Sequence, residues 1–158
     1  MLKNILLLDA ATEALSIAIS SQLSHAHFEV CPQQHSQKLL PLVKSQLDQA
    51  GFTLNQLDAI AFGRGPGSFT GVRVGVAVTQ GLAYAASLSV IGISNLQILA
   101  QQALCETQYD NVIATIDARM GEVYYAEFKR GENNLAEFES PERVVKPDRS
   151  VPQRVVNP

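Results

Sequence analysis

Residues 63–71, with the sequence GRGPGSFTG, constrain the fold of this 158-residue chain more than any other stretch. Four of these nine residues are glycine and one is proline. Such a composition specifies the path of the backbone, because glycine adopts positive φ and lets other groups approach the main chain closely. The stretch separates two apolar runs, residues 57–62 and 72–78. We therefore predict a tight connection from a strand into a helix.

Loops of this kind often bind phosphate on free backbone N–H groups at a helix N-terminus. This loop matches neither standard template. It lacks the lysine of a Walker loop, and Ser68 or Thr70 stands where the dinucleotide fingerprint needs its third glycine. Two interpretations stay open. Either Gly65, Gly67 and Ser68 are candidate cofactor-binding residues, or the loop only packs a helix against a strand.

The composition indicates a folded domain in a reducing compartment. Apolar residues make up 46% of the chain and charged residues 17%, which suits a sizeable core. The net charge is −3 and the Lys and Arg residues are scattered, so direct high-affinity nucleic-acid binding is not expected. Cys31 and Cys105 lack metal-ligand spacing. Without a signal-like or membrane-spanning stretch, we expect a cytoplasmic protein.

The hydrophobic period changes along the chain and predicts the order of strands and helices. Alternation predicts three antiparallel strands first. A helix closed by Gly51 follows, with Pro41 either delaying its start or distorting its first turn. We predict strands at residues 4–9, 15–20, 25–31, 58–62 and 90–93, and helices at 36–50, 70–86 and 94–105. The helix at 70–86 is apolar on nearly every side, so it needs cover from the sheet and from a second helix or a partner.

The chain then begins to repeat itself. Residues 113–126 resemble residues 5–18, with an Asp-Ala pair at the same point of each predicted hairpin. This order predicts an α/β, actin-like (ASKHA, ribonuclease-H-like) duplicated fold. We assign residues 1–107 to a complete ribonuclease-H-like first lobe. Residues 108–158 form a truncated second lobe that ends in a polar tail.

Asp9 and Asp117 are candidate cofactor-binding residues, because in duplicated folds of this class the two hairpins face a nucleotide cleft. Ala10 and Ala11 argue against this role, since nucleotide-binding hairpins carry Thr or Ser there. The alternative is that each aspartate bonds to its own nearby turn.

No catalytic or metal-binding set stands out. His25 and His27 would share a strand face without a third ligand. His35 precedes the first helix, where we predict an end-capping or packing role. Ser68 does not lie in a hydrolase-type Gly-x-Ser-x-Gly elbow.

Four motifs resemble the bacterial TsaB (YeaZ) family, over about residues 5–128. They are HSQKLLP at 35–41, GRGPGSFTGVR at 63–73, QGLA at 80–83 and IDARMGEVY at 116–124. The resemblance implies the actin-like fold and a role in the threonylcarbamoyl modification of the adenosine beside the tRNA anticodon. It also implies a TsaD-type catalytic subunit and a TsaE-type ATPase as partners, with tRNA contacted only through the complex. Relatives usually continue further, so we expect a truncated form or a fragment.

The catalytic relatives of this family carry a metal-binding His-x-x-x-His pair after the strand that corresponds to residues 90–93. Asn95 and Leu99 occupy these positions here, and an amide and an isobutyl group do not bind a transition metal. The resemblance therefore implies a non-catalytic scaffold without a metal or other cofactor. The alternative is an actin-like nucleotide-binding ATPase or a kinase-like enzyme.

The first two helices are the predicted partner interface. The helix at 70–86 is apolar on two faces, and Gly71 and Gly75 would let a neighbouring helix approach closely. We predict a homodimer when the chain is alone and a heterodimer with the catalytic subunit. The interface candidates, which could equally be core residues, are Leu39, Val43, Gly71, Val74, Gly75, Val78 and Leu82.

Overall fold

The computed structural model describes residues 4–21 and 25–147. The chain forms two compact units, Met1–Ile93 and Ser94–Pro158. The sequence prediction places the lobe boundary after residue 107 instead. Helix α3 (Asn95–Glu106) accounts for the difference, because it packs on the strands of the second unit. The predicted polar tail at 148–158 lies outside the described residues.

The first unit is a five-stranded sheet in the order β3-β2-β1-β4-β5. Its strands are β1 (Ile5–Asp9), β2 (Ala14–Ser20), β3 (His25–Val30), β4 (Ala59–Gly63) and β5 (Ser89–Ile93). The first three strands are antiparallel, as predicted, and β4 and β5 run parallel to β1. This mixed sheet confirms the predicted α/β, actin-like class.

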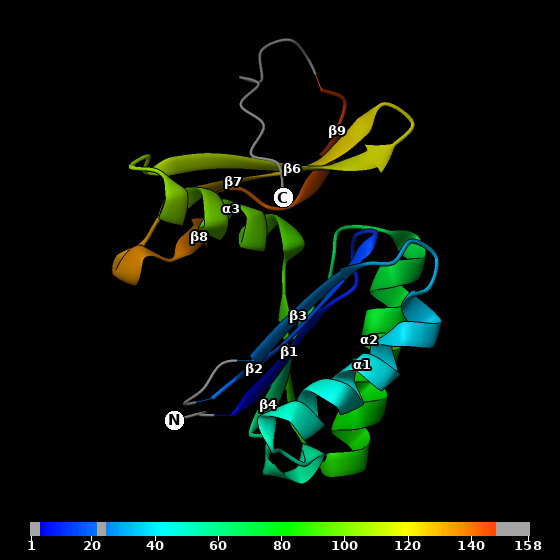
Figure 1. The fold of residues 1–158 in the computed structure, drawn as a ribbon. Helices are drawn as coiled ribbons and strands as arrows, with labels where there is room; N and C mark the ends of the chain where they lie inside the picture. The colour runs from blue at the N-terminus through cyan, green and yellow to red at the C-terminus, as the bar shows by residue number, and fades with distance from the viewer. Residues whose placement is uncertain (1–3, 22–24, 148–158) are drawn as a thin grey trace. The chain divides into compact units, whose positions relative to one another are not determined.

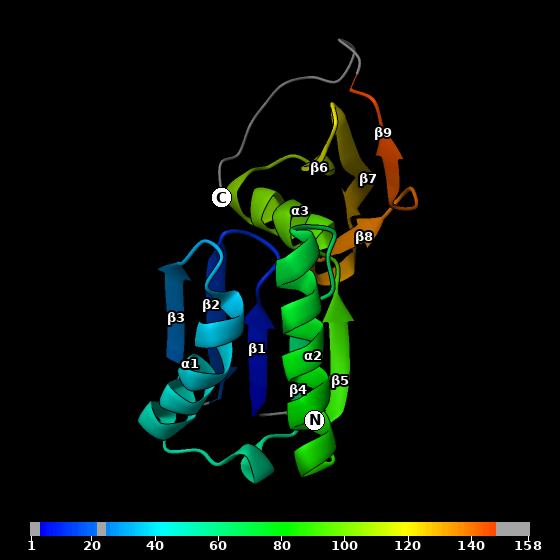
Figure 2. The same cartoon turned by 90° about the vertical axis from the view of Figure 1, so that its right-hand side faces the viewer.

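Two helices cover one face of this sheet. Helix α1 (His35–Ala50), the short turn η1 (Leu54–Gln56) and helix α2 (Phe69–Ala86) follow β3 and β4, and Figures 1 and 2 show α1 and α2 on the same side of the strands. Each fully buried aliphatic side chain between these layers contributes about 2 kcal/mol. The residues most deeply buried there are Leu6, Leu15, Ile17, Ile19, Leu39, Val43 and Ile60.

The C-terminal end of α1 follows from a local sequence signal. Gly51 adopts φ 72°, and the N–H groups of Gly51 and Phe52 donate to the carbonyls of Asp48 (3.2 Å) and Leu47 (2.9 Å). This is the Schellman arrangement that a glycine after a helix predicts. The alternative that Pro41 delays the start of this helix is wrong, because α1 begins at His35 and continues through Pro41.

The second unit packs α3 against one antiparallel sheet. The predicted hairpin is confirmed as β6 (Asn111–Arg119) and β7 (Glu122–Arg130). The short strands β8 (Ala136–Phe138) and β9 (Arg143–Val145) both pair with β7, and the turn η2 (Glu132–Asn134) precedes β8. The sequence prediction missed both short strands, because three residues do not establish an alternation. None of the helices among the described residues has the length and hydrophobicity needed to cross a membrane.

Candidate functional site

The glycine loop connects β4 to α2 and rests against the loop between β1 and β2. Ser68 is the N-cap of α2, and its hydroxyl accepts a hydrogen bond from the N–H of Gly71 (3.4 Å). The backbone N–H of Ser68 donates to the carbonyl of Ala11 at 2.7 Å. The backbone amide of Ser68, which could otherwise bind a phosphate, therefore already donates a hydrogen bond within the protein.

Close packing explains two of the glycines. A Cβ added at Gly67 would lie 2.4 Å from the carbonyl oxygen of Ala11, and one added at Gly71 would lie 1.9 Å from that of Ala10. Gly65 is required for a different reason, since its φ is +94°. Backbone carbonyls of the β1–β2 loop thus fill the space that a side chain would need. This packing supports the architectural interpretation of the motif.

The β1–β2 loop is also held from its other side. The Nε2 atom of His35 lies 2.9 Å from the carbonyl oxygen of Thr12. Because a carbonyl only accepts, Nε2 carries the proton in this contact. The N–H of Cys31 donates to the carbonyl of Glu13 at 2.9 Å. His35 is 7% exposed, so it has the packing role that its position predicts.

The two candidate aspartates make the same local contact in different units. Asp9 Oδ1 accepts from the N–H of Ala11 (3.3 Å), and Asp117 Oδ1 accepts from the N–H of Arg119 (2.8 Å). Each carboxylate therefore stabilises the turn two residues further on. The two hairpins differ in register. Asp9 pairs with Ser16, whereas Asp117 pairs with Val123, so the paired residue is one position closer in sequence in the second hairpin. Nucleotide binding by these aspartates stays a prediction.

The predicted interface residues lie on the inner sides of α1 and α2. Leu39 and Val43 are 0% and 1% exposed. Gly71 and Gly75 are buried, with Ala10 the nearest neighbour of a Cβ built at either position. The half-buried residues Val74, Val78 and Leu82 pack against the same core. Partner binding through these helices stays a prediction.

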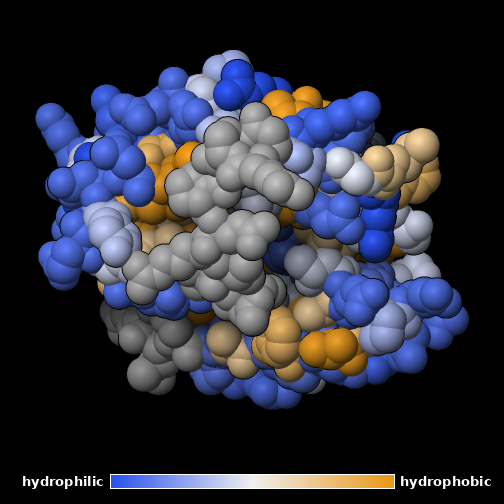
Figure 3. All heavy atoms as spheres, turned by 90° about the horizontal axis from the view of Figure 1, so that it is seen from above, coloured by the Kyte–Doolittle hydropathy of each residue, from blue (hydrophilic) through white to orange (hydrophobic). Residues whose placement is uncertain are grey.

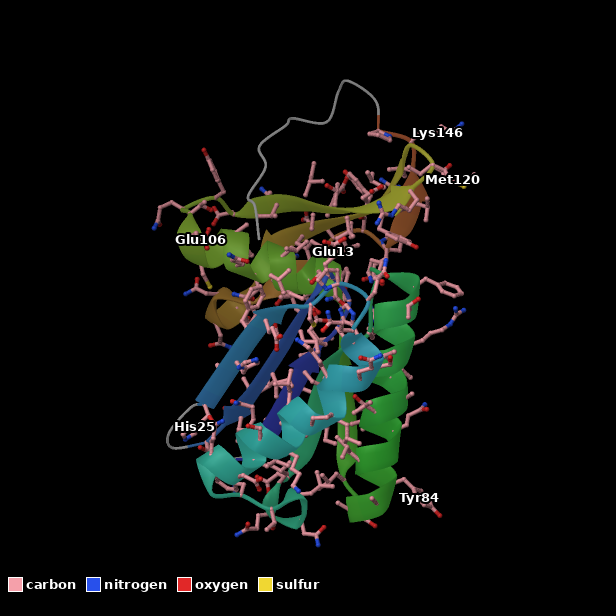
Figure 4. The ribbon with its side chains drawn as sticks, turned by 45° about the vertical axis from the view of Figure 1, so that its right-hand side comes forward. Glu13, His25, Tyr84, Glu106, Met120 and Lys146 are labelled. Carbon is pink, nitrogen blue, oxygen red and sulfur yellow. The ribbon has the colours of Figure 1, made fainter. Side chains whose placement is uncertain are left out.

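The outward side of α2 presents a continuous row at helical spacing. Phe69 is 73% exposed and Tyr84 is 91% exposed, and Figure 4 shows Tyr84 projecting away from the ribbon. The guanidinium carbon of Arg73 lies 3.2 Å from the centroid of the Phe69 ring, a cation–π contact. Helix α1 packs against α2, and we include its residue Leu40, which is 52% exposed, in the same set. We call this set the outer helix surface: Leu40, Phe69, Arg73, Ala77, Gln80, Gly81 and Tyr84.

The exposed apolar residues of the second unit are more scattered. Ile98, Met120, Leu135 and Val144 are exposed on four separate elements or turns. On the face that Figure 3 presents, hydrophilic side chains surround several separate apolar patches. Exposed apolar residues at scattered positions are normal for a folded protein. We take the outer helix surface as the candidate functional site, because it places the exposed aromatic residues Phe69 and Tyr84 on one side of a single helix.

A polar cluster joins β7 to β9 in the second unit. The hydroxyl of Tyr125 donates to Glu127 Oε1, and the guanidinium carbon of Arg143 lies 5.0 Å from the Tyr125 ring centroid. The hydrogen bond to Glu127 raises the pKa of Tyr125 above its ordinary value, and burial adds to the effect. This arrangement keeps Tyr125 protonated and fastens β9 to the sheet.

The start of α3 carries the positions compared with the catalytic histidine pair. Ser94 is its N-cap, with Oγ accepting from the N–H of Gln97 (3.3 Å) and donating to Glu142. Asn95 is 7% exposed, and Leu99 packs against the core of the second unit. Within residues 4–21 and 25–147, His, Cys, Asp and Glu side chains form no group of three that could hold a metal ion.

Comparisons with known proteins give one consistent result. The family model described as "TsaD: tRNA N6-adenosine threonylcarbamoyltransferase" matches residues 14–155. The chain is 49% identical over 145 residues to the Escherichia coli "tRNA threonylcarbamoyladenosine biosynthesis protein TsaB", and the match covers 91% of this chain and 63% of that protein. The Haemophilus influenzae protein of the same name is 43% identical, with 97% and 66% covered.

A solved structure agrees with these sequence matches. "YeaZ from Pseudomonas aeruginosa" is similar with a TM-score of 0.87 and 45% identity, over 96% of this chain and 72% of that one. The chain thus spans just under two thirds of the length of the two curated relatives and somewhat more of the solved one.

Proposed function

Because this chain belongs to the TsaB (YeaZ) family, we propose that it takes part in the biosynthesis of threonylcarbamoyladenosine in tRNA. Its role there is that of a non-catalytic scaffold, which binds a TsaD-type catalytic subunit through α1 and α2. The observation that carries this proposal is the outer helix surface, where Phe69 and Tyr84 are 73% and 91% exposed on one side of a single helix.

The composition of this surface supports a protein partner. Tyrosine and arginine are enriched among the residues that contribute most to protein–protein affinity. Phe69, stacked with Arg73, and Tyr84 lie near the two ends of α2. Between them Ala77 and Gly81 are exposed, and no atom lies within 4 Å of a Cβ built at Gly81. This pattern offers two aromatic anchors separated by small residues against which a partner helix can pack.

The absence of the histidine pair supports a role without chemistry. Asn95 and Leu99 lie one helical turn apart at the start of α3, where the catalytic relatives carry the two metal-binding histidines. An amide and an isobutyl group do not replace two imidazoles. We therefore assign the transferase chemistry to the partner.

The remaining partners follow from the same role. We propose a homodimer when the chain is alone, a TsaE-type ATPase in the assembled complex, and contact with tRNA only through that complex. The net charge of −3 supports the last point. Cys31 and Cys105 are both free, which supports the cytoplasm as the compartment.

A charge placed on the outer helix surface tests the proposal. We expect Ala77→Arg to abolish co-purification with the TsaD-type subunit and to weaken binding at least about 100-fold in titration calorimetry, because an unpaired charge at an interface costs several kcal/mol. Ala77 is exposed, so the circular dichroism spectrum should not change. Gln102→Arg, at an exposed position of α3, is the matched control and should bind normally. Wild-type affinity of Ala77→Arg would exclude this surface.

Nucleotide binding is the alternative function. It would use Asp9, Gly65, Gly67, Ser68 and Asp117, and the bond from Ser68 to Ala11 argues against it. We expect calorimetry with ATP and Mg²⁺ to detect no stoichiometric binding. Tight one-to-one binding would contradict the assignment as a scaffold without a cofactor.

A further inference from the structure

We propose that His35 is a positioning residue for partner binding, because it fixes the first turn of α1 against the β1–β2 loop. This inference rests on the proposed function, in which α1 and α2 together form the partner surface. Through His35, the loop sets where α1 begins relative to α2. His35 itself does not touch the partner, since it is 7% exposed.

Three consecutive carbonyls of the β1–β2 loop accept hydrogen bonds from three different segments. Ala11 accepts from the N–H of Ser68 (2.7 Å), and Thr12 accepts from Nε2 of His35 (2.9 Å). Glu13, which Figure 4 labels in this loop, accepts from the N–H of Cys31 (2.9 Å). Ser68 caps α2 and His35 is the first residue of α1. One short loop therefore holds the starts of both helices.

The two helices are not held equally well. The start of α2 is held by a backbone hydrogen bond from Ser68 and by the close packing of Gly67 and Gly71, none of which depends on a long side chain. The start of α1 relies more on side chains: the backbone bond from Cys31 to Glu13 lies before the helix, and within the first turn Lys38 donates to Glu29 of β3. Its N-cap, Gln34, makes no side-chain capping bond, and the first turn contains no acidic residue. The imidazole of His35 is the side chain that ties this turn to the loop.

Pro41 makes this contact more important. Proline has no backbone N–H, so the carbonyl of Gln37 lacks its usual donor four residues along the helix. The first turn is therefore joined to the rest of α1 by fewer hydrogen bonds than in an uninterrupted helix. Leu40 of the outer helix surface lies directly beside this weak point. A displaced first turn would move Leu40 relative to Phe69 and Arg73.

Two substitutions separate the hydrogen bond from simple space filling. In His35→Gln the side-chain amide reaches about as far as Nε2 and can still donate to Thr12. His35→Leu fills the site but leaves the Thr12 carbonyl without this donor. His35→Asn, whose shorter amide does not reach Thr12, repeats the test with a polar side chain if the leucine variant does not fold.

The first measurement is amide hydrogen exchange in the free protein. The N–H groups of Gln37 and Lys38 both bond to the carbonyl of Gln34, so they report on the first turn. We expect exchange at these amides to be about fivefold faster in His35→Leu, since one hydrogen bond is worth about 1 kcal/mol. The glutamine variant should exchange like the wild type. Unchanged exchange in His35→Leu and His35→Asn would overturn the inference.

The second measurement is affinity for the TsaD-type subunit. We expect His35→Leu to bind about fivefold more weakly and His35→Gln to restore binding. Faster exchange combined with wild-type affinity would overturn the positioning role. If the wild-type chain itself does not bind this subunit, the proposed function fails. The exchange experiment would still decide whether His35 fixes the start of α1.

Discussion

Gly71→Ala is expected to destabilise the first unit by about 3 kcal/mol, because the added Cβ would lie 1.9 Å from the carbonyl oxygen of Ala10. Real contacts of a Cβ are far longer, so α2 or the β1–β2 loop must move. The loop is also bonded to Ser68 and His35 and cannot move without weakening these contacts. Thermal unfolding followed by far-ultraviolet circular dichroism should show a midpoint lower by roughly 10 °C. The method suits a chain without tryptophan.

Gly81→Ala is the matched control in the same helix. No atom lies within 4 Å of a Cβ built at Gly81, so the alanine meets no obstacle. We expect stabilisation of about 0.5–1 kcal/mol, since glycine inside a helix costs that much relative to alanine. The two substitutions should therefore change the unfolding midpoint in opposite directions. A change of the same sign and size in both would show that helix propensity, and not contact with Ala10, decides the outcome.

Arg130→Ala is expected to destabilise the second unit by a similar amount, about 2–4 kcal/mol. Nη2 of Arg130 donates to the carbonyls of Leu104 (2.9 Å), Thr107 (3.1 Å) and Tyr109 (2.8 Å). Helix α3 ends without a glycine cap, so this guanidinium takes over the carbonyls at its C-terminus. The side chain is only 20% exposed, and its removal leaves these carbonyls unsatisfied.

Arg143→Ala is the control for loss of an arginine from the same sheet. Its ion pair with Glu127 spans 4.0 Å and its side chain is 53% exposed, so we expect a loss of about 1 kcal/mol or less. Urea unfolding of both variants, followed by circular dichroism, measures the difference. Equal losses in the two variants would contradict the capping role of Arg130.

Much of the first unit could be predicted from the sequence, because alternation and helical spacing are local properties. The antiparallel start and the glycine cap at Gly51 agree with the structure. The orientation of α2 could not be predicted. Valines at every second position from 72 to 78 fit several faces of a helix equally well. Polarity does not indicate the buried side of α2 either, because the polar residue Thr79 is 1% exposed whereas the apolar residue Ala77 is exposed.

The predicted interface residues rest on hydrophobicity, which does not separate core positions from a partner surface. Hydrophobicity predicts Leu39 and Val43 as interface residues, and in the structure both are buried completely. Phe69 and Tyr84, the large exposed residues of α2, are not among the predicted interface residues, because the sequence does not say which side of a helix faces the sheet. That information comes only from the packing of α2 on β1 and β4.

The sequence by itself determined that residues 63–71 form a tight entry from a strand into a helix, since glycine and proline restrict the backbone locally. Only the tertiary structure decided why two of these glycines are needed. The carbonyls of Ala10 and Ala11, more than fifty positions earlier in the chain, occupy the space where side chains at Gly71 and Gly67 would lie. A contact between segments so distant in sequence exists only once the sheet has brought β1 beside β4.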